Sequence, residues 1–578
     1  MYPTASPQIA AILRQAIAAA GRSQFPEAEY HFRQARAQAP RIPMIATGLG
    51  HVLRYQGRHA EAKAQFTDAI AMAPELADGH YGLGLVLQSM MDMAGAEAAL
   101  RAALARKTDL LPCLLALAEV FNATGRPDEA LVQLADAATP DIQLGAAIEL
   151  ARGSAYLAKE QNESALACFE RAIAAKPGHA EAAHARAVAL EALNREEEAL
   201  AGFRLVVKNN PNHMAAHYSL NQLLYRLKRD DEFLRSYDEA AAGFPGMPDF
   251  ALAKAGFLVR SERPAEALEL YEQALKLAPG EPVVLQGRAM AQLKLHKVDA
   301  AIASYEEGLR RAPQDIHMLT GAAAAYLIGR MPKKAEAAAL RALQMAPEDQ
   351  TGLSLLGTAW RAMENGRDHD LNRYDEFIQT FDLEPPSGFS DMAAFCGELD
   401  RWLDKLHSDQ REHIDQSLRF GTQTAGSLFR PGRNPLLDGL RLRIEEAVRL
   451  YIARLPQDER HPFLRRRGKD FRFAGSWSSR LKDTGFHANH IHTAGWISSA
   501  FYVALPETMR DTNTQEGWIK FGEPSFEAGL SDPVRRAVQP RVGRLVLFPS
   551  YMWHGTIPFH APQNRTTIAF DAVPVDQK

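Results

Sequence analysis

Prolines recur every 34 residues over much of the first 350 residues of this chain. Six of them keep this interval without a break, and two earlier ones show the same step: Pro177, Pro211, Pro245, Pro279, Pro313 and Pro347, and before them Pro40 and Pro74. A fixed period of this length indicates a repeat protein, in which each unit packs against its neighbours. One compact core is therefore excluded for this part of the chain.

Small and aromatic residues also recur inside the units. One unit and the next show the same set: Ala255, Ala267, Tyr271 and Ala274, then Ala289, Ala301, Tyr305 and Gly308. Small residues let two helices approach closely, an aromatic ring fills the gap, and a proline ends the second helix. The pattern resembles the tetratricopeptide repeat (TPR) family over about residues 9–349, with a one-residue break in the step near residues 108–140. The resemblance implies stacked helix pairs with a groove for peptides or proteins.

The chain is too long for one domain, because domains usually hold about 100–200 residues. We expect an all-α solenoid over residues 1–350, then a capping helix and linker over residues 351–388 that ends at the Pro385-Pro386 pair. Residues 389–578 are expected to form an α+β domain, with a helical lead-in at 390–455 and a core of short strands at about 461–578. Several short strands without helices between them favour a barrel or sandwich.

Composition and charge exclude several classes of protein. The 66 basic and 70 acidic side chains give a net charge of −4, which provides no bulk field for nucleic acid or an anionic membrane. No apolar run reaches the roughly 20 residues that a membrane span requires. The 3 cysteines are an odd number at distant positions, so we expect no disulfide framework, a reducing compartment and a cytoplasmic location.

Histidines are concentrated in the segment Gly485–His492, just before a predicted strand. In an extended chain, residues two apart point to the same side, so His490 and His492 can offer two imidazoles to one ion. A third imidazole, His554, follows an apolar strand, where a turn can direct it back toward the other two. Neutral imidazole suits iron, copper, nickel and zinc. The sequence therefore predicts a metal site.

Arg565 and Thr567 lie on one face of a later predicted strand. A guanidinium binds a carboxylate through two hydrogen bonds, and a neighbouring hydroxyl can add a third. This pair is therefore a candidate site for a small acid near the predicted metal.

Together these residues resemble the 2-oxoglutarate- and Fe(II)-dependent oxygenases. The resemblance lies over roughly residues 470–578, in FHANHIHTAGWISSAFYVALP, GRLVLFPSYMWHGT and RTTIAFD. It implies a double-stranded β-helix (jelly-roll) core, with Fe(II), 2-oxoglutarate as co-substrate, and O2. By position, it makes His490 the first iron ligand and His554 the distal one. It further implies that Arg565 and Thr567 bind the distal carboxylate of 2-oxoglutarate, and that Tyr502 presents a phenol to the same molecule.

The chain departs from this family at His492, where the common motif has an acid. His492 is either a third neutral ligand or a residue behind a two-histidine site that water and co-substrate complete. His487 and Asn489 form a competing pair, which points to the opposite face unless a bulge shifts the strand register. Strand parity favours His490 and His492.

The leading hypothesis is a dioxygenase that hydroxylates a protein or peptide captured by the TPR groove. One alternative is a non-catalytic TPR adaptor with a degenerate oxygenase barrel, and another is a cupin-like metal enzyme. The cupin pattern has a glutamate four or five residues after the histidine pair, where this chain has Trp496 and Ile497. The sequence gives no indication of the oligomeric state.

Two further features have two interpretations each. Trp496, Trp518 and Trp553 either line a substrate pocket or belong to the core, and the core is favoured. The basic run from Arg465 to Lys469 either contacts nucleic acid or forms a solvated strand edge. The second interpretation is favoured, because no aromatic residues alternate with the basic ones.

Overall fold

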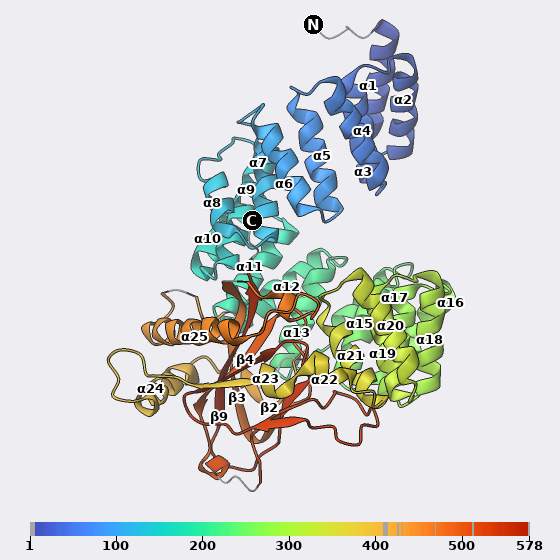
Figure 1. The fold of residues 1–578 in the computed structure, drawn as a ribbon. Helices are drawn as coiled ribbons and strands as arrows, with labels where there is room; N and C mark the ends of the chain where they lie inside the picture. Colours follow the sequence, from blue (N-terminus) through green and yellow to red (C-terminus); the bar gives the residue numbers. More distant parts are fainter. Residues whose placement is uncertain are drawn as a thin grey trace. The chain divides into compact units, whose positions relative to one another are not determined.

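The computed structural model describes residues 6–407, 414, 416–424, 427–430, 432–468, 470–510 and 514–575. The chain divides into two compact units, residues 1–216 and residues 217–578 (Figure 1). None of the helices in these described ranges combines the length and the hydrophobicity that a membrane span requires.

The first unit consists of paired helices. They are α1 (Pro7–Gly21), α2 (Phe25–Gln38), α3 (Pro43–Tyr55), α4 (His59–Met72), α5 (Ala77–Ser89), α6 (Met93–Leu104), α7 (Leu111–Ala123), α8 (Pro127–Leu134), α9 (Ile142–Ala158), α10 (Asn162–Ala175), α11 (Ala180–Ala192) and α12 (Glu196–Asn209). The break in the 34-residue step coincides with α8, which has only 8 residues, and α9, which has 17.

The recurring residues have the packing roles expected for them. The ring of Phe66 is fully buried against Gly82, where an added Cβ atom would lie 2.1 Å from a ring carbon, so only glycine fits there. Pro74 stands just after the C-cap of α4, and Pro347 stands just after the C-cap of α20. Proline cannot continue a helix, so the periodic prolines mark where each second helix ends.

The second unit continues the helical array and then changes to β-structure. Its helices are α13 (Met214–Arg226), which begins in the first unit, α14 (Arg235–Gly243), α15 (Asp249–Arg260), α16 (Pro264–Leu277), α17 (Pro282–Lys294), α18 (Val298–Arg311), α19 (Ile316–Ile328), α20 (Pro332–Met345), α21 (Gln350–Ala362), α22 (Arg367–Asn372) and α23 (Tyr374–Phe377). Helices thus cover residues 7–377, which confirms the predicted solenoid.

The β-structure forms two antiparallel sheets. The first has the order β1 (Gln379–Asp382), β7 (Arg544–Pro549), β4 (Ile497–Ala504), β9 (Arg565–Pro574), β3 (Phe471–His487) and β2 (Leu418–Gln423). The second has the order β6 (Arg536–Val538), β5 (Ile519–Phe521) and β8 (His554–Thr556). Two antiparallel sheets with these crossovers confirm a β-rich region after the solenoid, and they are compatible with the predicted jelly-roll core.

Two helices, α24 (Met392–Asp404) and α25 (Pro435–Arg454), lie against the six-stranded sheet (Figure 1). Their apolar residues share one core with the strands, as Phe395 and Ile444 do with Ile497 and Phe570, all of which are fully buried. The helices therefore cover the sheet on one side, and the candidate site described below lies between the sheet and β5 and β8.

Two strands lie in segments where the sequence patterns suggest other structure. β1 falls within the expected linker and pairs with β7, and β2 falls within the expected helical lead-in and pairs with β3. Both are short edge strands whose hydrogen-bond partners come from distant segments, so the local pattern does not reveal them. A bulge at Phe420, with φ of 56°, also interrupts the alternation of β2.

Candidate metal centre

Three histidines meet between the two sheets, and we call His490, His492 and His554 the histidine cluster. The amide N–H of His490 donates to the carbonyl oxygen of His554 at 2.9 Å, and the reverse bond measures 3.0 Å. The amide of His492 donates to the Ser550 carbonyl at 3.0 Å. These backbone bonds connect the β3–β4 connection to β8. One ring nitrogen from each histidine lies within 4.8 Å of the others.

The Nδ1 atom of every ring in the cluster is within hydrogen-bond distance of an oxygen acceptor. A carbonyl or carboxylate oxygen can only accept, so each Nδ1 carries a proton; in a neutral ring the Nε2 atom then presents a lone pair. The acceptors are the Ala488 carbonyl at 2.8 Å from His490, the Met552 carbonyl at 2.9 Å from His554, and Oδ1 of Asp571 at 2.5 Å from His492.

The donor set fits a metal cation. The Nε2 atoms of His490 and His492 lie 3.1 Å apart, within hydrogen-bond distance of each other. Burial, reinforced by neighbouring histidines, lowers the pKa of His490 to about 3 and holds the pKa of His554 well below its ordinary value. The rings of His490 and His554 are therefore neutral at pH 7, and neutral imidazole is a suitable ligand for a metal cation.

Asp571 is a site residue that the sequence analysis missed. Its Oδ1 accepts from the His492 ring at 2.5 Å and from the Ser498 hydroxyl at 2.6 Å. A carboxylate behind a metal-binding imidazole fixes the orientation of the ring and increases its basicity. The available signal was strand parity, because Asp571 lies on the same face of β9 as Arg565 and Thr567.

Arg565 is buried at the other end of the same strand face, with 2% of its surface exposed. Its Nε donates to the Gly517 carbonyl at 3.2 Å, and its guanidinium carbon lies 5.1 Å from the ring centroid of Tyr502. Among the described residues, no acidic side chain forms an ion pair with it. Burial lowers the pKa of Arg565. A buried guanidinium without a carboxylate partner favours binding of an anion.

Thr567 and Tyr502 are cross-strand neighbours on β9 and β4. Thr567 lines the same cavity as the histidine cluster and Arg565. Tyr502 is fully buried and stands beside Arg565, and burial raises the pKa of Tyr502. It does not line the cavity itself. The structure therefore brings Thr567 to the cavity wall and places Tyr502 as a support for Arg565.

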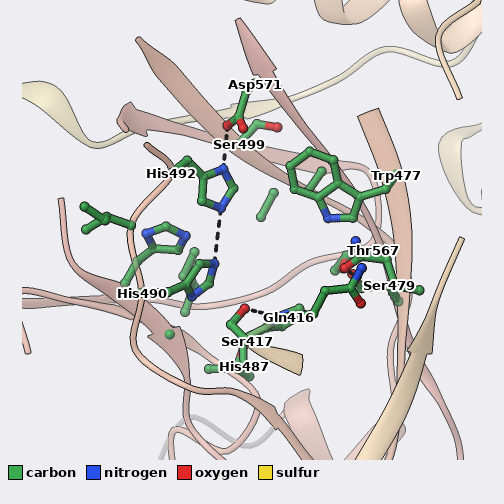
Figure 2. A pocket seen from close by; sticks show the side chains of 18 of the residues that line it. Gln416, Ser417, Trp477, Ser479, His487, His490, His492, Ser499, Thr567 and Asp571 are labelled. Atoms are coloured by element: carbon green, nitrogen blue, oxygen red, sulfur yellow. Dashed lines mark hydrogen bonds and ion pairs between the residues drawn. The ribbon is translucent and has the colours of Figure 1, made fainter. Parts of the chain in front are cut away.

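The cavity that joins these groups has a volume of about 320 Å³, within the usual range for small-molecule sites. Both sheets contribute to its walls. Trp477 lies across the cavity from the cluster, with its ring centroid 5.5 Å from that of His492, and Ser479 and Thr567 continue that wall (Figure 2). Gln416 and Ser417 also line the cavity. They precede β2 in an irregular segment, where sequence periodicity gives no signal.

Of the competing pair, His487 and Asn489, only His487 lines the cavity of the histidine cluster. His487 lines the cavity, with its Nδ1 3.4 Å from the Ser417 hydroxyl and its ring centroid 6.0 Å from that of His490. Asn489 lines a neighbouring cavity and donates to the Pro524 carbonyl at 3.2 Å. The two residues thus do not line the cavity of the histidine cluster together.

None of the three candidate pocket tryptophans lines the cavity. Trp496 is buried in the core of the domain, where its Nε1 donates to the Phe463 carbonyl at 2.9 Å. Trp553 packs away from the cavity against the helices of the second unit. Trp518 precedes β5.

The arginines of the basic run contact protein atoms. Arg465 donates to the Pro347 carbonyl at 2.7 Å, Arg466 forms an ion pair with Glu348 at 3.2 Å, and Arg467 donates to the Ile452 carbonyl at 2.9 Å. Lys469 lies outside the described residues. These contacts support a structural role for the run.

Family models match both parts of the chain. Tetratricopeptide repeat models match residues 47–112, 150–213, 203–248 and 258–325. The model described as "Putative 2OG-Fe(II) oxygenase" matches residues 475–571, which include the histidine cluster, Arg565 and Asp571. The family models thus find tetratricopeptide repeats followed by a domain that is similar to that oxygenase family. Both predicted resemblances are thereby confirmed, and we call the β-rich region the oxygenase domain.

No curated protein matches the chain. Solved structures with similar helical repeats include YrrB, described as a TPR protein with an unusual peptide-binding site, at 20% identity over 32% of this chain and 96% of that one (TM-score 0.27). The human IFIT1 dimer with PPP-AAAA matches at 16% identity over 58% and 82% (TM-score 0.36). Yeast Tom70 matches at 13% identity over 63% and 97% (TM-score 0.31).

Proposed function

We propose that the protein is an Fe(II)- and 2-oxoglutarate-dependent dioxygenase that hydroxylates a protein or peptide held by its TPR repeats. The observation that carries the proposal is the convergence of three imidazoles on a cavity that also contains a buried Arg565, with which no acidic side chain of the described residues forms an ion pair. In the proposal, His490, His492 and His554 bind the iron through their Nε2 atoms. With 2-oxoglutarate and O2, the iron supplies the oxidation that converts a substrate C–H to C–OH and releases succinate and carbon dioxide.

Residues of the chain position the reactants in this proposal. Arg565 binds the distal carboxylate of 2-oxoglutarate, and the hydroxyl of Thr567 adds a hydrogen bond to it. The Tyr502 ring holds the Arg565 guanidinium in position through a cation–π contact.

Three histidines leave the charge of Fe(II) uncompensated, where an acid ligand would offset part of it. The Asp571 carboxylate, behind His492, supplies a negative charge close to the site without occupying a ligand position. Dianionic 2-oxoglutarate supplies the rest when it binds. In this proposal His492 is a direct iron ligand. The carboxylate, which the common motif places on the iron, instead hydrogen-bonds to the His492 ring.

The substrate class follows from the architecture that accompanies the site. Stacked helical repeats present extended surfaces that bind polypeptide segments. A protein or peptide is therefore the proposed substrate, and nucleic acid is not, because the arginines of the basic run are occupied by protein contacts.

The test is succinate formation by the purified full-length protein with Fe(II), 2-oxoglutarate and fractionated cell-extract proteins as substrates. We expect substrate-dependent succinate from wild type and none from His554→Ala or Arg565→Ala. His560→Ala and Arg460→Ala are matched controls, because these side chains are 73% and 96% exposed. No succinate above background with any fraction contradicts the proposal.

Anaerobic titration separates the two alternatives. A charge-transfer band on addition of 2-oxoglutarate to the Fe(II) protein argues against an inert TPR adaptor. Oxygen consumption that does not depend on 2-oxoglutarate would instead favour a cupin-like enzyme.

A further inference from the structure

The last long helix of the solenoid, α21, contacts Trp553, which precedes β8, and Gly522, which follows the neighbouring strand β5. Thr358 and Arg361 lie on this helix, which belongs to the same compact unit as the oxygenase domain. The Thr358 hydroxyl accepts from Nε1 of Trp553 at 3.1 Å. Trp553 directly precedes His554. One hydrogen bond thus connects the solenoid to the neighbour of a proposed metal ligand.

Arg361 provides the second connection. Its side chain is buried, with 6% of the residue surface exposed, and it donates to the carbonyl oxygens of Gly522, Asp532 and Pro533. Gly522 has φ of 99°, and an added Cβ atom there would lie 3.1 Å from a guanidinium nitrogen. The backbone therefore approaches Arg361 as closely as a glycine permits.

These two contacts belong to a ring of hydrogen bonds that lies next to His554. The amide of Gly522 donates to the Trp553 carbonyl at 2.8 Å, and Phe521 of β5 pairs with His554 of β8. The ring runs from Arg361 to Gly522, from Gly522 to Trp553, and from Trp553 back to Thr358. Trp553, which precedes His554 in the chain, and Gly522, which follows the strand partner Phe521, are thus both held from α21.

Other contacts between the repeats and the oxygenase domain do not reach this ring. Arg330 forms an ion pair with Glu527 at 3.2 Å, and both side chains are more than half exposed. Arg465 donates to the Pro347 carbonyl. Such contacts hold the two parts together without touching a neighbour of a metal ligand, so they provide internal controls.

We propose that α21 is a positioning element of the metal centre, with Arg361 and Thr358 as positioning residues that hold His554 in line with His490 and His492. The inference rests on the proposed metal site. Metal ligands must be held to within about 0.5 Å of their productive positions, which requires support from a rigid element. It follows that metal binding and ordering of α21 are coupled, and the coupling acts in both directions.

The test uses the full-length protein and cobalt(II) as the metal. We expect Arg361→Ala to weaken cobalt(II) binding by about 10-fold, the lower end for loss of a residue that supports a ligand. Thr358→Val, which removes one hydrogen bond at similar volume, should weaken it by a few-fold. Arg330→Ala should stay within twofold of wild type. Calorimetric titration measures all four proteins.

A second measurement needs only wild type, so it applies even if a variant does not fold. Cobalt(II) should slow hydrogen exchange in peptides from α21 as well as in those around His554, because coupling is reciprocal. Cobalt(II) binding by wild type without protection of α21, or with equal affinity in Arg361→Ala and Thr358→Val, would overturn the inference and leave the metal site standing. Wild type that does not bind cobalt(II) would overturn the metal site itself.

Discussion

Replacing Asp571 tests whether its carboxylate supports the metal through His492. Asp571→Asn keeps an oxygen that can accept from the imidazole Nδ1 but removes the charge. A hydrogen bond to a charged group contributes about 1.5–3 kcal/mol, against about 0.5–1.5 kcal/mol for a neutral one. The variant should therefore lose about 1–1.5 kcal/mol of metal binding, which is roughly a 5- to 13-fold increase in the dissociation constant. Asp571→Ala loses the bond as well and should weaken binding by about 100-fold, the upper end for such partners.

The assay is anaerobic titration with cobalt(II), followed by calorimetry and by the visible absorption of the bound ion. Asp382→Asn is the matched control, because Asp382 lies on β1, pairs with Arg544 at 2.7 Å and has a side chain that is 63% exposed. Its affinity should equal that of wild type. The reasoning is refuted if both Asp571 variants bind cobalt(II) within twofold of wild type while remaining folded.

Three further predictions concern the co-substrate, the metal and pH. Arg565→Ala should raise the dissociation constant of 2-oxoglutarate by about 100-fold in calorimetry of the cobalt(II)-loaded protein, since a charged bidentate contact is lost, and unchanged binding would contradict this. Cobalt(II) at about 100 times its dissociation constant should stabilise the fold by about 2.7 kcal/mol. A chelator should therefore lower the melting temperature of the cobalt(II)-loaded wild type but not that of His554→Ala. Equal shifts in both proteins would contradict the proposed site. Burial, with a smaller effect of Arg54, lowers the pKa of His51 from 6.5 to about 4. The unfolded chain therefore takes up this proton first as pH falls from 6.5 to 4, so the unfolding free energy should drop by about 1.4 kcal/mol per pH unit over this range. His51→Gln should reduce this slope in urea unfolding curves. An unchanged slope in the variant would contradict a neutral His51 ring in the folded protein.

The solenoid could be predicted because its information is local and repeated. A proline such as Pro347 follows the end of each second helix, and a ring such as Phe66 requires a glycine opposite it, so every unit repeats the same constraints. The strands β3 to β9 lie within the range predicted for short strands, about residues 461–578. β1 and β2 do not, because each is defined by the backbone of a distant strand rather than by its own residues.

The site was predictable where residue type alone carries the chemistry. Histidines and an arginine are conspicuous, and the structure brings His490, His492 and His554 together with Arg565 in one cavity. Asp571 was not identified, because the role of a single acidic residue in a strand cannot be inferred until its hydrogen-bond partner is known. The pairing with His492 spans 79 positions in the chain and depends on the register between β4 and β9.

The most direct test of the proposed metal centre is a crystal structure of the protein soaked anaerobically with Fe(II) and 2-oxoglutarate. The proposal predicts one iron with the Nε2 atoms of His490, His492 and His554 at about 2.0–2.2 Å, the usual distance of a nitrogen ligand. It also predicts a 2-oxoglutarate carboxylate paired with the Arg565 guanidinium. An iron bound by His487 in place of a member of the histidine cluster, or a cavity that takes up neither iron nor 2-oxoglutarate, would contradict it.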